Sequence, residues 1–165
     1  MKIGVLSDTH SCWDDRYVKH FACCDEIGHA GDIGDVDTLQ KLMAIGPTVR
    51  AVSGNIDNAT VRRYCKELLE FETAGAKVIL THIGGYPGRY APGMRRLLIE
   101  KRPTIMVCGH SHILRVMFDK EIGVLHINPG AAGYYGWQKT RTLIRFDIND
   151  GKPSNLEVIE LGVAK

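Results

Sequence analysis

Short apolar runs alternate with helical patterns through the first two thirds of this 165-residue chain. The helical patterns place apolar residues on one face and fall at residues 14–23, 36–44, 60–69 and 92–102. The apolar runs predict strands at residues 2–7, 25–30, 48–53, 70–73, 77–81 and 104–108. Most of these strands end at a polar or glycine-containing cluster, and their alternation with helices is typical of parallel strands.

In the last third of the chain, the predicted strands follow one another without a helical pattern between them. We expect strands at residues 115–119, 123–127, 142–147 and 155–161, joined by turns. Strands connected in this way pair antiparallel or in a mixed sheet. The chain is long enough to bury a core and fits a single domain over residues 1–165. The sequence therefore predicts an α/β fold, shading into α+β, in which two β-sheets pack together with helices on their outer faces.

The charge balance argues against a nucleic-acid polymer as partner. The chain carries 21 basic and 19 acidic residues, a net charge of +2, whereas proteins that neutralise many phosphates have a clear basic excess. A single phosphate group bound in a pocket is still allowed. Hydrophobic residues make up 44% and charged residues 24%, which is ordinary for a globular protein.

The five cysteines do not indicate a disulfide framework or a thiolate zinc site, because their number is odd and no Cys-x-x-Cys pair occurs. No stretch approaches the roughly 18 apolar residues needed to cross a membrane, and the first apolar run is shorter than the core of a signal peptide. We therefore expect a cytoplasmic protein that has no membrane partner.

Polar clusters follow the strands at five places that are far apart in the sequence. One candidate ligand from each cluster gives the set Asp8, Asp32, Asn55, His82 and His110. Successive members are 24, 23, 27 and 28 residues apart, which is about one strand–helix–strand unit. Because the carboxyl ends of parallel strands meet at one edge of a sheet, we expect these side chains to converge in space.

Two further histidines lie two positions from members of this set: His10 follows Asp8, and His112 follows His110. In extended backbone, this spacing points both side chains to the same side. Imidazole nitrogen combined with carboxylate oxygen suits manganese, iron, zinc or nickel better than calcium or magnesium. One carboxylate can bridge two ions, and Asp32, central among the clusters, is the candidate. The pattern thus predicts a site for a pair of metal ions.

These motifs resemble those of the calcineurin-like metallophosphoesterase superfamily, especially its small single-domain phosphodiesterases from bacteria and archaea. The matching residues are Asp8 and His10, Gly31-Asp32 with Asp35, Gly54-Asn55 with Asp57, Thr81-His82, Gly109-His110-Ser111-His112 and Asn128-Pro129-Gly130. The resemblance extends from residue 1 to about residue 147. It implies a four-layer α-β-β-α fold, in which a two-sheet sandwich is flanked by helices.

The resemblance also implies which residues hold two divalent metal ions. One ion would take Asp8, His10, Asp32 and His112, and the other Asp32, Asn55, His82 and His110, so that Asp32 is the bridge. Manganese is the expected metal, with iron, zinc and nickel as alternatives. Two ions about 3.5–4 Å apart clamp the phosphate oxygens and lower the pKa of a bound water from about 15.7 towards 7. The resulting hydroxide would attack phosphorus in line, without a covalent nucleophile.

The implied function is hydrolysis of a small phosphate ester, with phosphodiesters favoured. The ligand set does not distinguish a phosphodiesterase from a phosphomonoesterase or nucleotidase, so that alternative stays open. A second alternative is a non-catalytic scaffold, because the retromer complex contains a subunit of this fold with a degraded metal site. The scaffold predicts lost ligands, whereas here all seven positions carry a ligand residue.

The sequence departs from the superfamily pattern at three positions. Ile56 stands where many members carry a histidine that acts as general acid. The fourth motif reads His82-Ile83-Gly84 rather than His-Gly-His, so the second imidazole is missing. Ala131 follows the Asn-Pro-Gly turn, where serine is frequent. None of these changes removes a candidate metal ligand.

Several other polar residues lie near the motifs. Asp35 and Asp57 are interpreted as residues that orient ligands, because ligating histidines need a partner for their second ring nitrogen. His29 precedes Asp32 by a short interval, and it either orients a ligand or packs in the core. A structural or solvent-facing role is expected for His20 and His126.

Two loops carry aromatic side chains whose role the sequence leaves open. Residues 84–90 are rich in glycine and form either a solvated loop or a lip at which Arg89 meets a phosphate oxygen. Tyr134, Tyr135 and Trp137 form the second loop, which would line the pocket or contact another subunit of a homo-oligomer.

Overall fold

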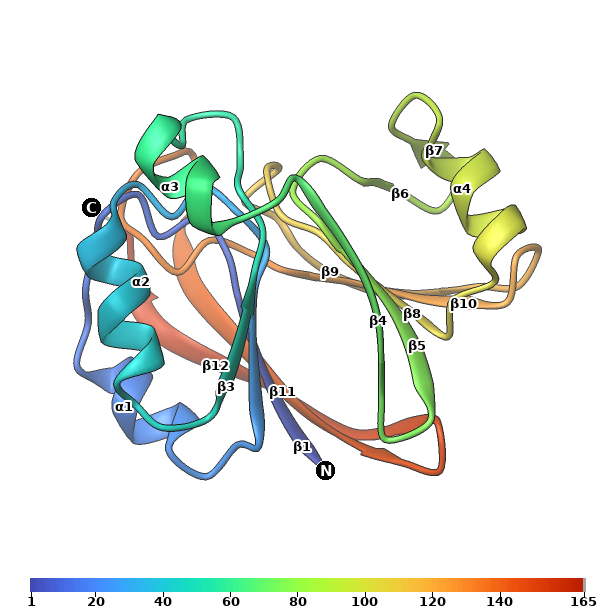
Figure 1. Cartoon of the computed structure of the whole chain (residues 1–165), viewed down its shortest axis with the longest axis horizontal. Helices are drawn as coiled ribbons and strands as arrows, with labels where there is room; N and C mark the ends of the chain where they lie inside the picture. The colour runs from blue at the N-terminus through green and yellow to red at the C-terminus, as the bar shows by residue number, and fades with distance from the viewer. Residues whose placement is uncertain (165) are drawn as a thin grey trace.

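Two five-stranded sheets form the framework of the chain, of which the computed structural model describes residues 1–164 (Figure 1). The first sheet has the strand order β12 (Lys152–Val163), β11 (Thr140–Asn149), β1 (Lys2–Leu6), β2 (Glu26–His29) and β3 (Thr48–Ala51). The second has the order β4 (Leu68–Thr73), β5 (Ala76–Thr81), β8 (Ile105–Val107), β10 (Val124–Pro129) and β9 (Leu114–Asp119). A hairpin joins β6 (Gly85–Tyr86) and β7 (Arg89–Tyr90). The helices are α1 (Arg16–Phe21), α2 (Val36–Met43), α3 (Ala59–Tyr64) and α4 (Met94–Lys101).

Three neighbouring strands run parallel in each sheet. In the first sheet, β1 pairs with β2 and β2 with β3, so that Leu6, His29 and Ala51 lie side by side. In the second sheet, β5 pairs in parallel with β8, and β8 with β10. The other neighbours are antiparallel, namely β1 with β11, β11 with β12, β4 with β5, and β9 with β10. Each sheet therefore presents three aligned carboxyl ends, and the mixed pairing expected for the last third of the chain is confirmed.

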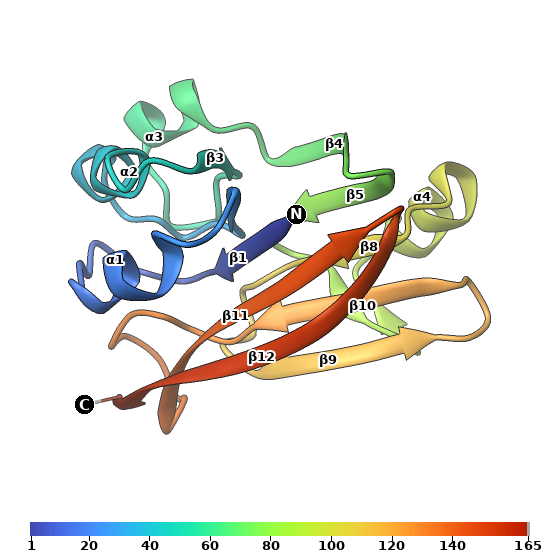
Figure 2. The ribbon, with the colours of Figure 1, turned by 90° about the horizontal axis from the view of Figure 1, so that it is seen from below.

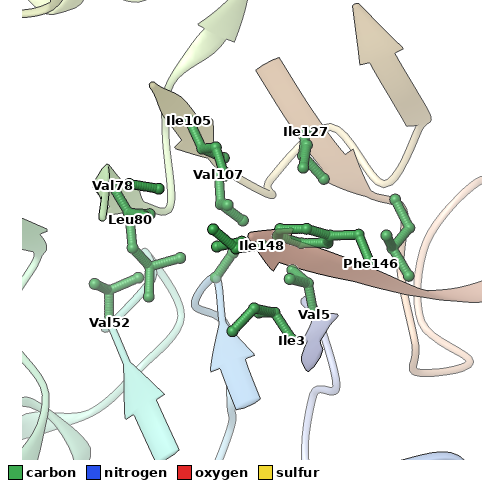
Figure 3. Close-up of a cluster of buried hydrophobic side chains, with 13 residues drawn as sticks. Ile3, Val5, Val52, Val78, Leu80, Ile105, Val107, Ile127, Phe146 and Ile148 are labelled. Carbon is green, nitrogen blue, oxygen red and sulfur yellow. The ribbon is translucent and has the colours of Figure 1, made fainter. Parts of the chain in front are cut away.

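The main hydrophobic core lies between the two sheets (Figure 3). Ile3, Val5 and Phe146 of the first sheet belong to the same buried cluster as Val78 and Ile105 of the second. Each of these side chains is 7% exposed or less. Removal of this apolar surface from water holds the sheets face to face.

Helices cover the outer faces of the sheets, which confirms the expected four layers (Figures 1 and 2). Tyr17 and Phe21 of α1 pack with Leu6 and Ile27 on the first sheet, and α2 joins the same cluster. Helix α3 packs beside α2. On the other side, α4 packs against the second sheet through Leu98.

Two segments differ from the sequence prediction. The helix expected over residues 60–69 ends at Tyr64, because the chain from Leu68 onward pairs with β5 and satisfies its backbone groups there. The loop expected at residues 84–90 contains the β6–β7 hairpin. No helix within residues 1–164 is long and apolar enough to cross a membrane.

Candidate metal centre

The loops that follow β1, β2, β3, β5 and β8 meet at one place and bring the predicted ligands together. His112 Nε2 is 3.2 Å from Asp8 Oδ1. His82 Nε2 is 3.3 Å from Asp32 Oδ1, and His10 Nε2 is 3.6 Å from Asp32 Oδ2. Both carboxylates are buried. Side chains that are far apart in the sequence thus form one cluster, because they follow strands whose carboxyl ends are aligned.

Asn55 and His110 complete the cluster. Asn55 Oδ1 is 3.0 Å from His82 Nε2 and 2.9 Å from His110 Nδ1. The rings of His82 and His110 meet edge to face with centroids 5.2 Å apart. His10 and His112 form a second such pair at 5.4 Å. The four imidazoles are therefore packed tightly around the carboxylates and the amide.

The backbone of these loops is left-handed where it was expected to be extended. The φ angle is 54° at Asp8, 47° at His10, 53° at Asp32, 67° at His110 and 57° at His112. The chain turns sharply after each strand and forms loop-to-loop bonds, as when the Asp8 N–H donates to the Gly31 carbonyl at 3.0 Å. Such conformations cost about 1–3 kcal/mol each and concentrate at functional sites.

Two glycines allow the loops to approach each other closely. A Cβ at Gly54 would overlap the Asp32 carboxylate, and one at Gly31 would lie 2.7 Å from the His82 ring. Gly31 also has a φ of 90°, which side-chain-bearing residues rarely adopt. Glycine is therefore needed at both positions for the carboxylate and imidazole to occupy their places.

The donor set of the cluster fits transition-metal ions. Ligand atoms of Asp8, His10 and His112 all lie within 4.8 Å of one another, and so do those of Asp8, Asp32 and His82. Within residues 1–164, His10 Nε2 is buried without a hydrogen-bond partner. An unpartnered buried polar atom is costly, and a cation at this place would supply the missing interaction.

The carboxylates favour protonation of two neighbouring imidazoles. Hydrogen bonding to Asp8 raises the pKa of His112 despite burial. Burial opposes charge on His82, but its hydrogen bond to Asp32 and the charge of Asp8 raise its pKa on balance. For His10, burial prevails over both carboxylates and lowers the pKa. A divalent cation would compete with these protons for the same nitrogen atoms.

Comparison with known families agrees with this donor set. A sequence model described as the calcineurin-like phosphoesterase superfamily domain matches residues 1–151. The chain belongs to this superfamily. A probable metallophosphoesterase from Methanothermobacter thermautotrophicus is 32% identical over 141 residues, covering 79% of this chain and 77% of that protein. The resemblance that the motifs predicted is therefore confirmed.

Solved structures share the superfamily fold. The structure of a novel archaeal phosphodiesterase has a TM-score of 0.76 at 19% identity, covering 98% of this chain and 100% of that one. Zinc-bound wild-type Vps29 from Entamoeba histolytica also has a TM-score of 0.76, at 17% identity, with 97% of this chain and 99% of that one covered. At these identities the likeness concerns the fold, and it agrees with two sheets flanked by helices.

Asp57 ties together two of the loops that carry superfamily motifs. Its carboxylate accepts the N–H groups of Gly54 and Gly34, each at 2.7 Å, and that of Ile33 at 3.2 Å. Arg62 of α3 donates to the Asp57 carbonyl at 2.8 Å and the Gly54 carbonyl at 2.6 Å. Asp57 therefore orients the backbone that carries candidate ligands rather than the side chain of a candidate ligand.

Asp35 and His29 form hydrogen bonds that hold the backbone next to the cluster. Asp35 caps α2, where its carboxylate accepts the Thr38 N–H at 2.8 Å. His29 Nδ1 accepts the Gly31 N–H at 3.2 Å, so Nε2 carries the proton and donates to Thr9 Oγ1 at 2.9 Å. Burial lowers the pKa of His29 to about 4, which keeps the ring neutral near pH 7. This buried ring joins the loops after β1 and β2.

Two amide side chains hold the loop after β8. Gln138 Oε1 is 3.0 Å from His112 Nδ1, which places a proton on Nδ1 and leaves Nε2 facing Asp8. Asn128 Nδ2 donates to the Gly109 carbonyl at 2.9 Å. The Asn-Pro-Gly motif pointed to Asn128, whereas nothing in the sequence pattern marked Gln138.

The remaining polar candidates lie outside the cluster. Arg89 is exposed in β7, and its contact with a phosphate stays a prediction. His126 is buried in β10, where its Nε2 is 2.8 Å from the Gly85 carbonyl oxygen. His20 lies in α1 and is partly exposed. The positions of both histidines fit the expected structural or solvent-facing roles.

We predict that Asp57→Ala destabilises the fold markedly, because three backbone N–H groups lose their acceptor. At about 1–3 kcal/mol for each unsatisfied buried group, the free energy of unfolding should fall by roughly 3 kcal/mol or more in urea titrations. Asp37→Ala is the matched control, because Asp37 is 69% exposed and pairs with Lys41 on the helix surface; its effect should stay below about 1 kcal/mol. Equal losses in the two variants would contradict the assigned role of Asp57.

Proposed function

We propose that this chain hydrolyses phosphodiesters with two divalent metal ions bound at the cluster, manganese being the favoured metal. One ion would be held by Asp8, His10, Asp32 and His112, and the other by Asp32, Asn55, His82 and His110. The observation that carries this proposal is the position of Asp32. Its Oδ2 faces His10 at 3.6 Å, while its Oδ1 faces His82 at 3.3 Å, an arrangement that suits a carboxylate bridging two ions.

Asp8 is the rival for the bridging role, since it belongs to both candidate ligand groups. In Asp8 a single oxygen, Oδ1, faces both sides, at 3.2 Å from His112 and 4.0 Å from His82, while Oδ2 accepts the His110 N–H at 3.2 Å. Asp32 instead directs a different oxygen to each side. We therefore give Asp32 the bridging role and Asp8 to the ion beside His10 and His112.

The proposed activity follows from the metal chemistry and from the residues that support it. Two bound divalent ions supply Lewis acidity that polarises the phosphate and lowers the pKa of water. Gln138 fixes the orientation of His112, and the Ala30 carbonyl, 2.7 Å from His82 Nδ1, does the same for His82. The chain itself therefore supplies ligands held in fixed rotamers and a partly exposed face for the ester.

The choice of a diester is supported by the fold shared with the archaeal phosphodiesterase. A phosphomonoesterase stays the alternative, and the rates of hydrolysis of a diester and of a monoester distinguish the two. A scaffold role is less well supported, because all seven candidate ligands are retained. A cytoplasmic location, one domain over residues 1–165 and homo-oligomer formation stay predictions.

Metal removal tests the proposal directly. A chelator should abolish hydrolysis of bis-p-nitrophenyl phosphate, Mn²⁺ should restore it, and p-nitrophenyl phosphate should be cleaved more slowly. Metal analysis should find two ions per chain. Asp32→Ala should lower the occupancy of both sites and reduce activity by several orders of magnitude, whereas His112→Ala should weaken one site.

Three results would count against this function. Full activity in metal-stripped protein would exclude a metal mechanism. Two retained ions in Asp32→Ala would exclude Asp32 as the bridge. Faster cleavage of the monoester would favour the phosphomonoesterase. Asp37→Ala, an exposed change on α2, serves as the control and should match the unaltered protein in all assays.

A second prediction concerns the leaving group. Ile56 is 45% exposed, and its backbone N–H donates to Asp32 at 3.0 Å. Its hydrocarbon side chain has no proton to donate. His29, fully buried and bonded to Thr9, cannot serve instead. A general acid typically contributes about 10²–10⁴-fold. We therefore expect log kcat for a series of aryl methyl phosphates to fall steeply as the pKa of the leaving group rises.

Ile56→His should make that dependence shallower, provided that the ring reaches the departing oxygen. Ile56→Val is the matched control and should keep the steep slope. A flat dependence in the unaltered protein, with chemistry shown to be rate-limiting, would mean that another group already donates the proton.

A further inference from the structure

The loop after β10 presents large aromatic side chains to solvent beside the candidate metal ligands. Trp137 is fully exposed (102%) and Tyr135 is 71% exposed. Both face a cavity of about 380 Å³ that is lined by His110, Ser111, His112, Tyr135, Gly136 and Trp137. An exposed tryptophan next to a site is a common feature of binding surfaces, because its large apolar ring is removed from water only when a ligand or partner covers it.

Contacts at both ends hold this loop in place. Tyr134 lies against the buried Arg141, whose guanidinium is 3.9 Å from the ring centroid. Gln138 Nε2 donates to the Gly133 carbonyl at 3.1 Å and to the Tyr135 carbonyl at 2.9 Å. These anchors fix the backbone on either side of Trp137, so its indole is presented by an ordered loop.

The same loop is fastened to a candidate metal ligand. Gln138 Oε1 bonds His112, and Gly136, with a φ of 123°, approaches so closely that a Cβ would overlap the His112 ring. On the other side, the Tyr135 ring lies 4.9 Å from that of His10. The aromatic surface therefore adjoins the place where a bound phosphate would be held.

We propose that the aromatic loop, residues 134–138, binds an aromatic group attached to the phosphate of the substrate, by stacking on Trp137 and Tyr135. The substrate class is thus an aryl or nucleoside phosphoester. This inference rests on the proposed function, because the phosphate must lie at the cluster for its substituent to enter the cavity. Among residues 1–164, the wall of the cavity contains no acidic side chain that would repel an anionic ester.

The chain offers a direct spectroscopic test, because Trp13 and Trp137 are its only tryptophans. In Trp13→Phe, all tryptophan fluorescence comes from Trp137. With Mn²⁺ in every sample, AMP or phenyl phosphate should quench this fluorescence within seconds of mixing, while ribose 5-phosphate should not. Quenching by AMP alone would identify a nucleobase, and quenching by both compounds would identify a general aryl site. No quenching by either, or equal quenching by ribose 5-phosphate, would overturn the proposal.

Inhibition of bis-p-nitrophenyl phosphate hydrolysis provides the second arm. Stacking of a base on an aromatic side chain strengthens binding about five- to a hundredfold. Trp137→Ala should therefore weaken inhibition by AMP about tenfold and leave inhibition by inorganic phosphate unchanged, and Trp137→Phe should restore most of the loss. Phe118→Ala is the matched control, since Phe118 is 58% exposed on β9. It pairs with Leu125, near the end of β10 that is opposite to the aromatic loop.

Equal weakening of AMP and inorganic phosphate by Trp137→Ala would overturn the proposal, because it would mean that the loop acts only through His112. The two arms also separate this inference from the proposed function. If bis-p-nitrophenyl phosphate is not hydrolysed at all, the phosphodiesterase fails, while the fluorescence titration still decides whether Trp137 binds an aromatic group.

Discussion

Two carboxylates buried side by side determine how the rest of the site is arranged. Asp8 is 0% and Asp32 2% exposed, and both have oxygen atoms within 4.8 Å of His82. Like charges in a region of low dielectric are unfavourable unless cations or N–H groups lie close by. The His110 N–H reaches Asp8, and the Ile56 N–H reaches Asp32. Imidazole nitrogens surround the remaining oxygens, and bound divalent ions would complete the neutralisation.

The fold meets this constraint with strand ends and tight loops. Three parallel strands in each sheet align their carboxyl ends. Beyond those ends the chain turns through left-handed conformations, which cost free energy that the packed core and loop contacts must offset. Asp57 and His29 provide such contacts. Stability and metal binding are therefore coupled through the same loops, although the sheets have a core of their own.

The sequence predicted which side chains form the cluster, but not the backbone conformations and hydrogen bonds that hold them there. Candidate ligands such as Asp32 and His82 could be found because each follows a strand, and aligned strand ends must converge. The left-handed backbone at His10 could not be found, because it depends on hydrogen bonds between loops. The contact from Gln138 was equally hidden, since a lone glutamine has no pattern. The early end of α3 reflects pairing of Leu68 with Thr81, which overrode a helical periodicity.

The central claim is that this cluster binds two metal ions with Asp32 between them. Anomalous diffraction at the manganese absorption edge, from crystals grown with Mn²⁺, tests it most directly. We expect two peaks about 3.5–4 Å apart, each within coordination distance of one Asp32 oxygen. The peak beside Asp32 Oδ2 should contact His10, and the peak beside Oδ1 should contact His82. A single peak, or two peaks bridged by Asp8 alone, would contradict the account.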